Sequence, residues 1–284
     1  MRLVLVSDTH ITPRAAAFGD NWEAVRVWIE ARAPDLVVNL GDISADGAHD
    51  PGELEAARLA IGRLSRPMRF LPGNHDIGDN PIAAGAPNEH PLDLARLADY
   101  RRLFGPDRWV FEAGRWAIIG LNAQLFATGT DEESAQFAWL EAELRGRSGP
   151  VGLMLHKPLF RNGPGDTEAH VRYVPASARR GLLALLAPCD LRFVLSGHVH
   201  QMRRLEVDGV EHIWVPSTAY CIPDAMQERI GEKTVGIAVL ELTDRGHSFE
   251  FATPPGLVRH NLLDHPGVYP KLSAPNRSRR PEAP

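Results

Sequence analysis

The chain has 284 residues, of which 44% are hydrophobic and 24% charged, and its formal net charge is −5. Such a chain can bury the core of one large α/β domain or of two smaller ones, and this composition excludes a disordered or fibrous protein. The negative net charge argues against the positive surface potential of a general nucleic-acid-binding protein, so we expect no nucleic-acid partner.

The cysteine content and the N-terminus predict a cytoplasmic protein. Only Cys189 and Cys221 occur, which is too few for a disulfide framework, and we interpret both as small buried residues. The first apolar run, residues 3–6, is too short for the core of a signal peptide. No stretch approaches the roughly 20 apolar residues of a membrane span, so we expect no transmembrane segment.

Short apolar runs alternate along the chain with segments of helical periodicity. The runs of strand length lie at residues 3–6, 35–40, 68–71, 116–121, 151–155 and 191–195. The helical patterns lie at residues 22–33 (after the candidate cap Asp20), 54–64, 92–104, 132–145 and 176–186. Most runs are rich in Val, Leu and Ile without alternation, which is typical of strands buried on both faces. The alternation predicts a layered α/β fold with a largely parallel portion of sheet.

The C-terminal part of the chain predicts antiparallel strands. A hairpin with a type I′ turn at Asp208-Gly209 joins residues 204–207 and 210–215. A second hairpin joins residues 235–242 and 248–252. After about residue 254 the chain is rich in Pro, Asn, Ser and Arg. We therefore predict one domain over residues 1–254 and a poorly ordered tail over residues 255–284.

Five of the predicted strands lead into residue types that bind metals or transfer protons. In chain order these residues are Asp8, His10, Asp42, Asn74, His75, Asp76, His156, His198 and His200. Side chains at the carboxyl ends of parallel strands converge on one edge of the sheet, where α/β proteins place their sites. Gly41, Gly73 and Gly197 permit tight turns beside these residues.

The chemistry of this set indicates a reactive metal centre. Each motif alone is weak, since an isolated Asp8 is more often a turn residue and a lone His156 more often a packed histidine. Together they combine carboxylate, carboxamide and imidazole without a thiolate, which suits Mn, Fe or Zn in a reactive site. The seven candidate ligands, which are the nine residues without His75 and Asp76, can hold two ions if one carboxylate bridges the ions. A two-metal site can acidify water and orient a phosphate, so the set predicts phosphoryl chemistry.

The motifs resemble those of the calcineurin-like metallophosphoesterases, whose pattern runs Asp-x-His, Gly-Asp, Gly-Asn-His-Asp/Glu, His and Gly-His-x-His. All five blocks occur here in order, over residues 3 to about 218. The resemblance implies a four-layer αββα sandwich and two metal ions. It assigns one ion to Asp8, His10, Asp42 and His200, and the other to Asp42, Asn74, His156 and His198. Asp42 and a hydroxide would bridge them, His75 would assist the leaving group, and Asp76 would orient His75.

Differences from other branches narrow this resemblance. Purple acid phosphatases carry a tyrosine where this chain has Ala45, and serine/threonine phosphatases carry a glutamate where it has Asp76. The Ser-Asp-Thr-His start and the Pro-Gly-Asn-His-Asp block are similar to bacterial class III cyclic-nucleotide phosphodiesterases and glycerophosphodiesterases. A 3′,5′-cyclic nucleotide is therefore the first expected substrate. A glycerophosphodiester or phospholipid head-group diester comes second, and a phosphomonoester third.

Substrate contacts are expected from loops above the metal edge, in addition to Asn74 and His75. Residues 77–91 and residues 157–172 are candidates, the latter with Arg161 and His170. Tyr220 is a third candidate. For each loop residue a solvated or packing role is the commoner alternative.

Two other classes of function stay open. A catalytically silent scaffold of this fold would be expected to lose some ligands, and none is missing. A nuclease would need a basic groove, which this acidic chain does not suggest. By analogy with relatives, the second hairpin and the apolar residues near Ile222 could support a homo-oligomer.

Overall fold

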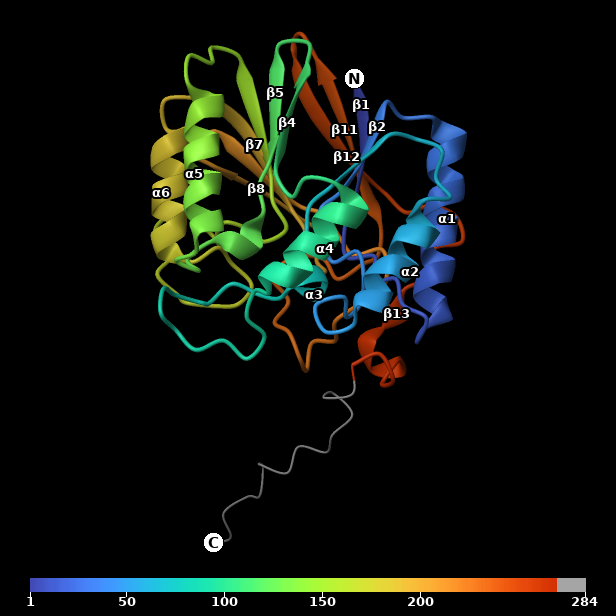
Figure 1. The fold of residues 1–284 in the computed structure, drawn as a ribbon. Helices are drawn as coiled ribbons and strands as arrows, with labels where there is room; N and C mark the ends of the chain where they lie inside the picture. Colours follow the sequence, from blue (N-terminus) through green and yellow to red (C-terminus); the bar gives the residue numbers. More distant parts are fainter. Residues whose placement is uncertain (270–284) are drawn as a thin grey trace, which may run out of the picture.

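The computed structural model describes residues 1–269, which form two packed β-sheets with helices on both outer faces (Figure 1). The first sheet has the order β12-β11-β1-β2-β3. Its strands are β1 (Arg2–Val6), β2 (Leu36–Asn39), β3 (Met68–Phe70), β11 (Ile237–Thr243) and β12 (Gly246–Ala252). The second sheet has the order β4-β5-β6-β7-β9-β8. Its strands are β4 (Trp109–Ala113), β5 (Trp116–Gly120), β6 (Pro150–Met154), β7 (Asp190–Ser196), β8 (Arg203–Val207) and β9 (Val210–Trp214).

Helices complete the predicted four-layer αββα sandwich. The helices packed on the first sheet are α1 (Ala16–Arg32), α2 (Pro51–Ile61) and α4 (Leu94–Phe104). Those packed on the second sheet are α5 (Asp131–Leu144) and α6 (Ala176–Leu186). Figure 1 shows the two groups of helices on opposite sides of the paired sheets. The smaller elements are α3 (Asn74–Ile77), η1 (Ala123–Leu125), β10 (Tyr220–Cys221), β13 (His260–Asn261) and η2 (Leu262–Asp264).

Strand β1 shows why its apolar run does not alternate with polar residues. Leu3 and Leu5 join the core between the two sheets, whereas Val4 and Val6 join the core beneath α1, α2 and α4. Successive side chains of a strand point to opposite faces, so a strand covered on both faces needs apolar residues throughout. The parallel pairings β1 with β2 and β2 with β3 bring three strand carboxyl ends to one edge of the sheet.

The two predicted hairpins are present as β8–β9 and β11–β12. Asp208 and Gly209 have φ values of 53° and 77°, the two positive angles that a type I′ turn requires. Antiparallel pairing also occurs earlier in the chain, between β4 and β5. Strand β4 was not predicted, because it is an edge strand whose apolar run is interrupted by Glu112.

Two predicted boundaries differ from the structure. Helix α1 begins at Ala16 rather than after Asp20. The additional N-terminal turn is stabilised because Phe18 is buried in a cluster with Tyr220. Residues 255–269, predicted as a poorly ordered tail, contain β13 and η2. The remainder of that predicted tail, residues 270–284, lies outside the described residues.

Both cysteines are free thiols, Cys221 buried and Cys189 only half-buried. Among residues 1–269, no helix is both long and apolar enough to span a bilayer.

Candidate functional site

The loops that follow five strands meet at one edge of the sandwich. The loops after β1 and β2 run side by side, because Asp8 N donates to Gly41 O and His10 N donates to Asp42 O, both at 3.0 Å. The loop after β7 joins them through His198 N, which donates to Asp8 Oδ2 at 3.0 Å. A side chain at position 197 would collide with Ser7 and Asp8, so this close approach requires the glycine that occupies it.

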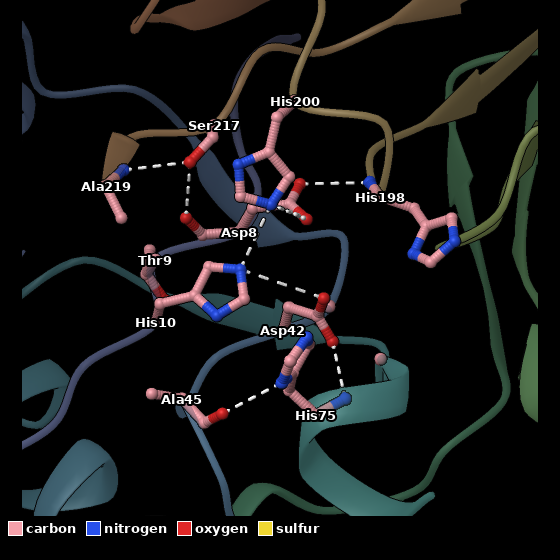
Figure 2. Close-up of polar contacts among 12 residues, drawn as sticks. Asp8, Thr9, His10, Asp42, Ala45, His75, His198, His200, Ser217 and Ala219 are labelled. Atoms are coloured by element: carbon pink, nitrogen blue, oxygen red, sulfur yellow. Dashed lines mark hydrogen bonds and ion pairs between the residues drawn. The ribbon is translucent and has the colours of Figure 1, made fainter. Parts of the chain in front are cut away.

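The backbone at this edge is unusual. Among residues 1–269, eight non-glycine residues have a positive φ, and five of them are predicted metal ligands. These five are Asp8, His10, Asp42, His198 and His200, with φ between 42° and 67°. Such conformations are costly for residues with a Cβ and cluster at functional sites. The fold therefore bends the chain sharply at the positions where the ligand side chains must converge (Figure 2).

One cluster of candidate ligands combines Asp8, His10 and His200, whose ligand atoms all lie within 4.8 Å of one another. His200 Nε2 lies 3.3 Å from Asp8 Oδ1 and 3.1 Å from His10 Nε2. Asp8 Oδ1 is buried without a hydrogen bond. A buried carboxylate oxygen that faces two imidazole nitrogens fits a cation between them, because all three can act as electron-pair donors.

A second cluster combines Asp42, His156 and His198, again with ligand atoms within 4.8 Å. His156 Nε2 lies 3.2 Å from Asp42 Oδ2 and 3.2 Å from His198 Nδ1. Asp42 Oδ2 also lies 3.8 Å from His10 Nε2, so this carboxylate lies between the two clusters. Asn74 Oδ1 is buried with no hydrogen-bond partner, as expected for an oxygen reserved for an ion.

Backbone carbonyls fix the orientation of three of these rings. His156 Nδ1 bonds to Leu40 O at 2.9 Å, and His200 Nδ1 bonds to Tyr220 O at 3.0 Å. His198 Nε2 bonds to Val171 O at 3.2 Å. A carbonyl can only accept, so each ring carries its proton on that side and presents its other nitrogen to the cluster. This is the ring arrangement that metal-binding histidines use.

The charges of these clustered residues point to the same chemistry. Burial alone would raise the pKa of Asp42, but the nearby His156 and His75 lower it well below its usual value. Burial alone would lower the pKa of His156, but the Asp42 carboxylate raises it to about 9. A protonated His156 thus supplies positive charge to a buried carboxylate. Bound metal ions would take over that role and displace the proton.

His75 lies beside the ligands with its ring held by the backbone. Its backbone N–H donates to Asp42 Oδ1 at 2.8 Å, and its ring Nδ1 donates to the carbonyl of Ala45 at 2.8 Å (Figure 2). The ring packs edge-on against that of His10, with the centroids 4.8 Å apart. Nε2 is therefore the ring atom left to face a reacting group.

The Asp76 carboxylate contacts the loops around His75 rather than the His75 ring itself. Asp76 is buried and accepts hydrogen bonds from Ile43 N, Ser44 N, Ser44 Oγ and Gly73 N. Burial, together with the negative charge of Asp42, raises the pKa of Asp76 to about 6. Asp76 ties the loop after β2 to the loop after β3. The Ala45 carbonyl that contacts His75 Nδ1 lies in the same loop, two residues beyond Ile43.

A cavity of about 720 Å³ opens beside Asn74 and His75. Its lining residues are Asp46, Ala48, His49, Asn74, His75, Asp79, Asn80, Ile82, Pro87, Asn88, Glu89, His90, Val171, Val268 and Tyr269. Residues 77–91 thus supply much of the wall, as the sequence predicts. The lining contains three carboxylates and neither lysine nor arginine.

Two of the predicted substrate residues lie elsewhere. Arg161 is outside the lining and donates to Glu228 Oε1 at 2.6 Å. His170 is also outside it and accepts from Arg172 N at 3.1 Å. Both belong to the loop over residues 157–172, of which only Val171 lines the cavity. The position of a loop after a strand that carries a candidate ligand therefore did not predict which of its residues line the cavity.

Two site features escaped the sequence analysis. The first is Lys157, 1% exposed, whose Nζ donates to Asp79 and, at 2.6 Å, to Asn80 Oδ1 in the cavity wall. Its position directly after His156 was the available signal. The second is Tyr269, which bonds to His10 Nδ1 at 2.7 Å. No motif marked Tyr269, because it reaches the site from the segment predicted as a tail.

Comparisons with known proteins agree with this geometry. The chain is 28% identical over 229 residues to the 3′,5′-cyclic adenosine monophosphate phosphodiesterase CpdA of Escherichia coli K12, covering 77% of this chain and 76% of that protein. It is 26% identical over 205 residues to the glycerophosphodiester phosphodiesterase GpdQ of Enterobacter lignolyticus, covering 67% and 64%. The fold is similar to that of a dimetal phosphatase from Danio rerio, with a TM-score of 0.60, 14% identity and coverage of 89% and 99%. The model of the calcineurin-like phosphoesterase family matches residues 1–202, and the chain belongs to this family of metal-dependent phosphoesterases.

Proposed function

We propose that this phosphoesterase hydrolyses a small phosphodiester, with a 3′,5′-cyclic nucleotide as the first candidate substrate. The observation that carries the proposal is the composition of the cavity beside Asn74 and His75. Its volume, about 720 Å³, falls in the range of small-molecule sites. Its wall combines apolar side chains with histidines and carboxylates, and the cations Arg14 and Lys157 are paired with the lining residues Asp46 and Asp79.

The two ligand clusters would hold two metal ions. The proposed ligands are Asp8, His10, Asp42 and His200 for one ion, and Asp42, Asn74, His156 and His198 for the other. The nitrogen and oxygen donor set suits Mn, Fe or Zn. When bound, the ions supply Lewis acidity that activates water and stabilises charge on the phosphoryl oxygens.

His75 is the proposed general acid. Its Nδ1 donates to Ala45 O, so in the protonated ring Nε2 would donate a proton or hydrogen bond to the departing oxygen. Asp76 is proposed as a positioning residue, since it anchors the loop whose Ala45 carbonyl holds that ring. Removal of the leaving group as a neutral alcohol would keep a second negative charge out of the cavity.

The cavity wall favours a diester over other phosphate compounds. A phosphodiester carries one negative charge, whereas a monoester dianion or a nucleic-acid backbone would bring further charge toward Glu89, the lining carboxylate that is not paired with Arg14 or Lys157. Ile82 and Pro87 offer apolar surface to a base or sugar. CpdA, named for cyclic AMP hydrolysis, supports the same substrate class.

A glycerophosphodiester is the second candidate. Glu89 in the cavity wall would favour a head group that carries hydroxyls or an ammonium, and GpdQ is named for the class of glycerophosphodiesters. A cyclic nucleotide has no such cation, so the two candidates can be separated by direct comparison.

The test is hydrolysis by metal-stripped protein re-supplied with Mn²⁺. Initial rates on bis(p-nitrophenyl) phosphate and p-nitrophenyl phosphate would be compared, followed by 3′,5′-cyclic AMP and glycerophosphoethanolamine. We expect faster cleavage of diesters, loss of activity in Asp42→Ala, and full activity in Asp20→Ala, which changes an exposed residue of α1. Faster monoester hydrolysis, or no metal-dependent activity on any of the four compounds in folded protein, would refute the proposal.

A further inference from the structure

The segment from His260 to Tyr269 is built into the edge of the sandwich next to the metal ligands. Strand β13 pairs with β10, with His260 opposite Tyr220. Leu262 and Val268 are buried in a cluster with Phe18 and Tyr220. These contacts fix the place where the following residue, Tyr269, enters the site.

Tyr269 contacts three residues of the site. Its hydroxyl lies 2.7 Å from His10 Nδ1 and 3.1 Å from the hydroxyl of Tyr220. Its ring lies 5.2 Å from that of His75, centroid to centroid. Tyr269 also lines the cavity together with Asn74 and His75. One side of this residue therefore supports His10, and the other side faces the space available to a substrate.

The hydrogen-bond arrangement leaves the Tyr269 proton available. His10 presents Nε2 to Asp42 and His200, so in a metal-loaded site its proton must lie on Nδ1, which then donates to the Tyr269 oxygen. The Tyr220 hydroxyl donates to the same oxygen. A tyrosine hydroxyl has two acceptor positions and one proton. Both acceptor positions are used, and within residues 1–269 the proton has no recorded acceptor.

The same contacts exclude Tyr269 as a metal ligand. Its oxygen meets Nδ1 of His10, which is the ring atom on the side away from Asp42 and His200. A hydroxyl in this position holds the ring from behind rather than sharing its ion. Its proton is then available to an acceptor in the cavity that Tyr269 lines.

We propose that Tyr269 is a substrate-binding residue whose hydroxyl donates a hydrogen bond to a phosphoryl oxygen of the bound ester. Its ring forms the cavity wall beside His75, and its oxygen fixes the proton of His10 on Nδ1. This inference rests on the proposed phosphoesterase function and extends it to a residue outside the metal-binding motifs. A phosphate oxygen is the matching acceptor, because a hydrogen bond to a charged group is stronger than one to a neutral group.

The test compares Tyr269→Phe with Tyr173→Phe in the full chain. Tyr173 is a matched control, because it is buried, its hydroxyl has no hydrogen-bond partner, and it lies outside the cavity lining. Binding of inorganic phosphate to Mn²⁺-loaded protein would be measured by calorimetry. We expect about tenfold weaker binding in Tyr269→Phe and wild-type binding in Tyr173→Phe.

Saturation with Mn²⁺ and a kinetic readout separate substrate binding from structural support. Because loss of the hydrogen bond to His10 Nδ1 should itself weaken Mn²⁺ binding, phosphate binding and kinetics would be measured at Mn²⁺ concentrations that saturate each protein. Under these conditions the kcat/KM of Tyr269→Phe for bis(p-nitrophenyl) phosphate should fall about tenfold through KM. Recovery of wild-type phosphate binding at saturating Mn²⁺ would overturn the proposal and leave Tyr269 as support for His10. Unchanged phosphate binding would overturn it as well.

The phosphate measurement also keeps this inference distinct from the proposed function. If wild-type protein binds phosphate but cleaves no diester, the substrate proposal fails while the comparison of Tyr269→Phe with Tyr173→Phe still decides the role of Tyr269. If diesters are cleaved and Tyr269→Phe behaves as wild type throughout, the function stands and Tyr269 is only part of the cavity wall.

Discussion

The metal edge and the cavity wall are built in different ways. At the proposed metal edge, short motifs directly after buried strands supply the proposed ligands, and backbone carbonyls such as Leu40 O fix the rings of the histidines among them. The cavity wall is assembled from residues 77–91, from Lys157 behind them and from Tyr269 near the end of the described chain. The reaction class is therefore encoded locally in the sequence, whereas substrate selection depends on tertiary contacts between distant segments.

The strongest test of this contrast removes the one reactive group that bridges the two regions. His75→Gln should lower kcat for diester hydrolysis by about 10²- to 10⁴-fold, because it deletes a general acid, while two metal ions remain bound. Steady-state kinetics and metal analysis of the same sample would check this. If metal content falls together with kcat, His75 acts through the metal site and the contrast fails.

Lys157 tests whether the wall depends on its buried ion pair. Lys157→Met should lower the free energy of unfolding by about 3 kcal/mol, because Asp79 would be left largely buried without its cation. The KM for diesters should rise, since Asp79 and Asn80 line the cavity.

Arg204→Met is the matched control for this change, because Arg204 pairs with Glu211 on the surface and should lose less than about 1 kcal/mol. Denaturant unfolding gives both values. Equal losses in the two variants would show that the Lys157 pair has no special part in the wall.

His212 of β9 sharpens the comparison, because it is a histidine buried by packing rather than by a site. Burial lowers its pKa to about 4. The unfolded chain therefore takes up a proton near pH 6.5, which folded His212 takes up only near pH 4, so this group destabilises the fold progressively as pH falls between these values.

From pH 7 to pH 5 the loss from His212 should be about 2 kcal/mol. His212→Leu should remove this part of the pH dependence, whatever its effect on stability at pH 7. Unfolding free energies of both proteins at the two pH values would check it. Parallel pH dependences would contradict the lowered pKa.

The smallest effects are expected from the two predicted substrate residues that lie outside the cavity. Arg161→Ala and His170→Ala should each leave kcat/KM for diesters within about twofold of wild type, since Arg161 instead pairs with the surface residue Glu228. A tenfold loss in either variant would show that the loop over residues 157–172 moves into the cavity when substrate binds.

Much of the fold could be predicted from the sequence, because its signals are local. Strands such as β1, buried on both faces, show continuous apolar runs, and the Asp208-Gly209 turn marks its hairpin directly. Strand β4 was missed because an edge strand tolerates a charged residue, and the start of α1 was missed because the tertiary burial of Phe18 lengthens the helix.

In the candidate site, too, residues marked by local motifs could be predicted, whereas residues placed by tertiary contacts could not. Asp8, His10 and the other motif residues were predicted because each follows a strand whose carboxyl end lies at one edge. Tyr269 could not be predicted, since nothing near it in the sequence marks a site and its contacts depend on the pairing of β13 with β10. The position of Arg161 could not be predicted either. The sequence indicates where the loop begins but not which of its side chains point into the cavity.

The most direct test of the central claim is the number of metal ions that the two ligand clusters hold. Mass-spectrometric metal analysis of Mn²⁺-reconstituted protein should give two ions per chain in wild type and fewer than one in Asp42→Ala, which removes the carboxylate between the clusters. A folded wild-type protein that binds one ion or none would contradict the assignment of these residues as a two-metal phosphoesterase centre.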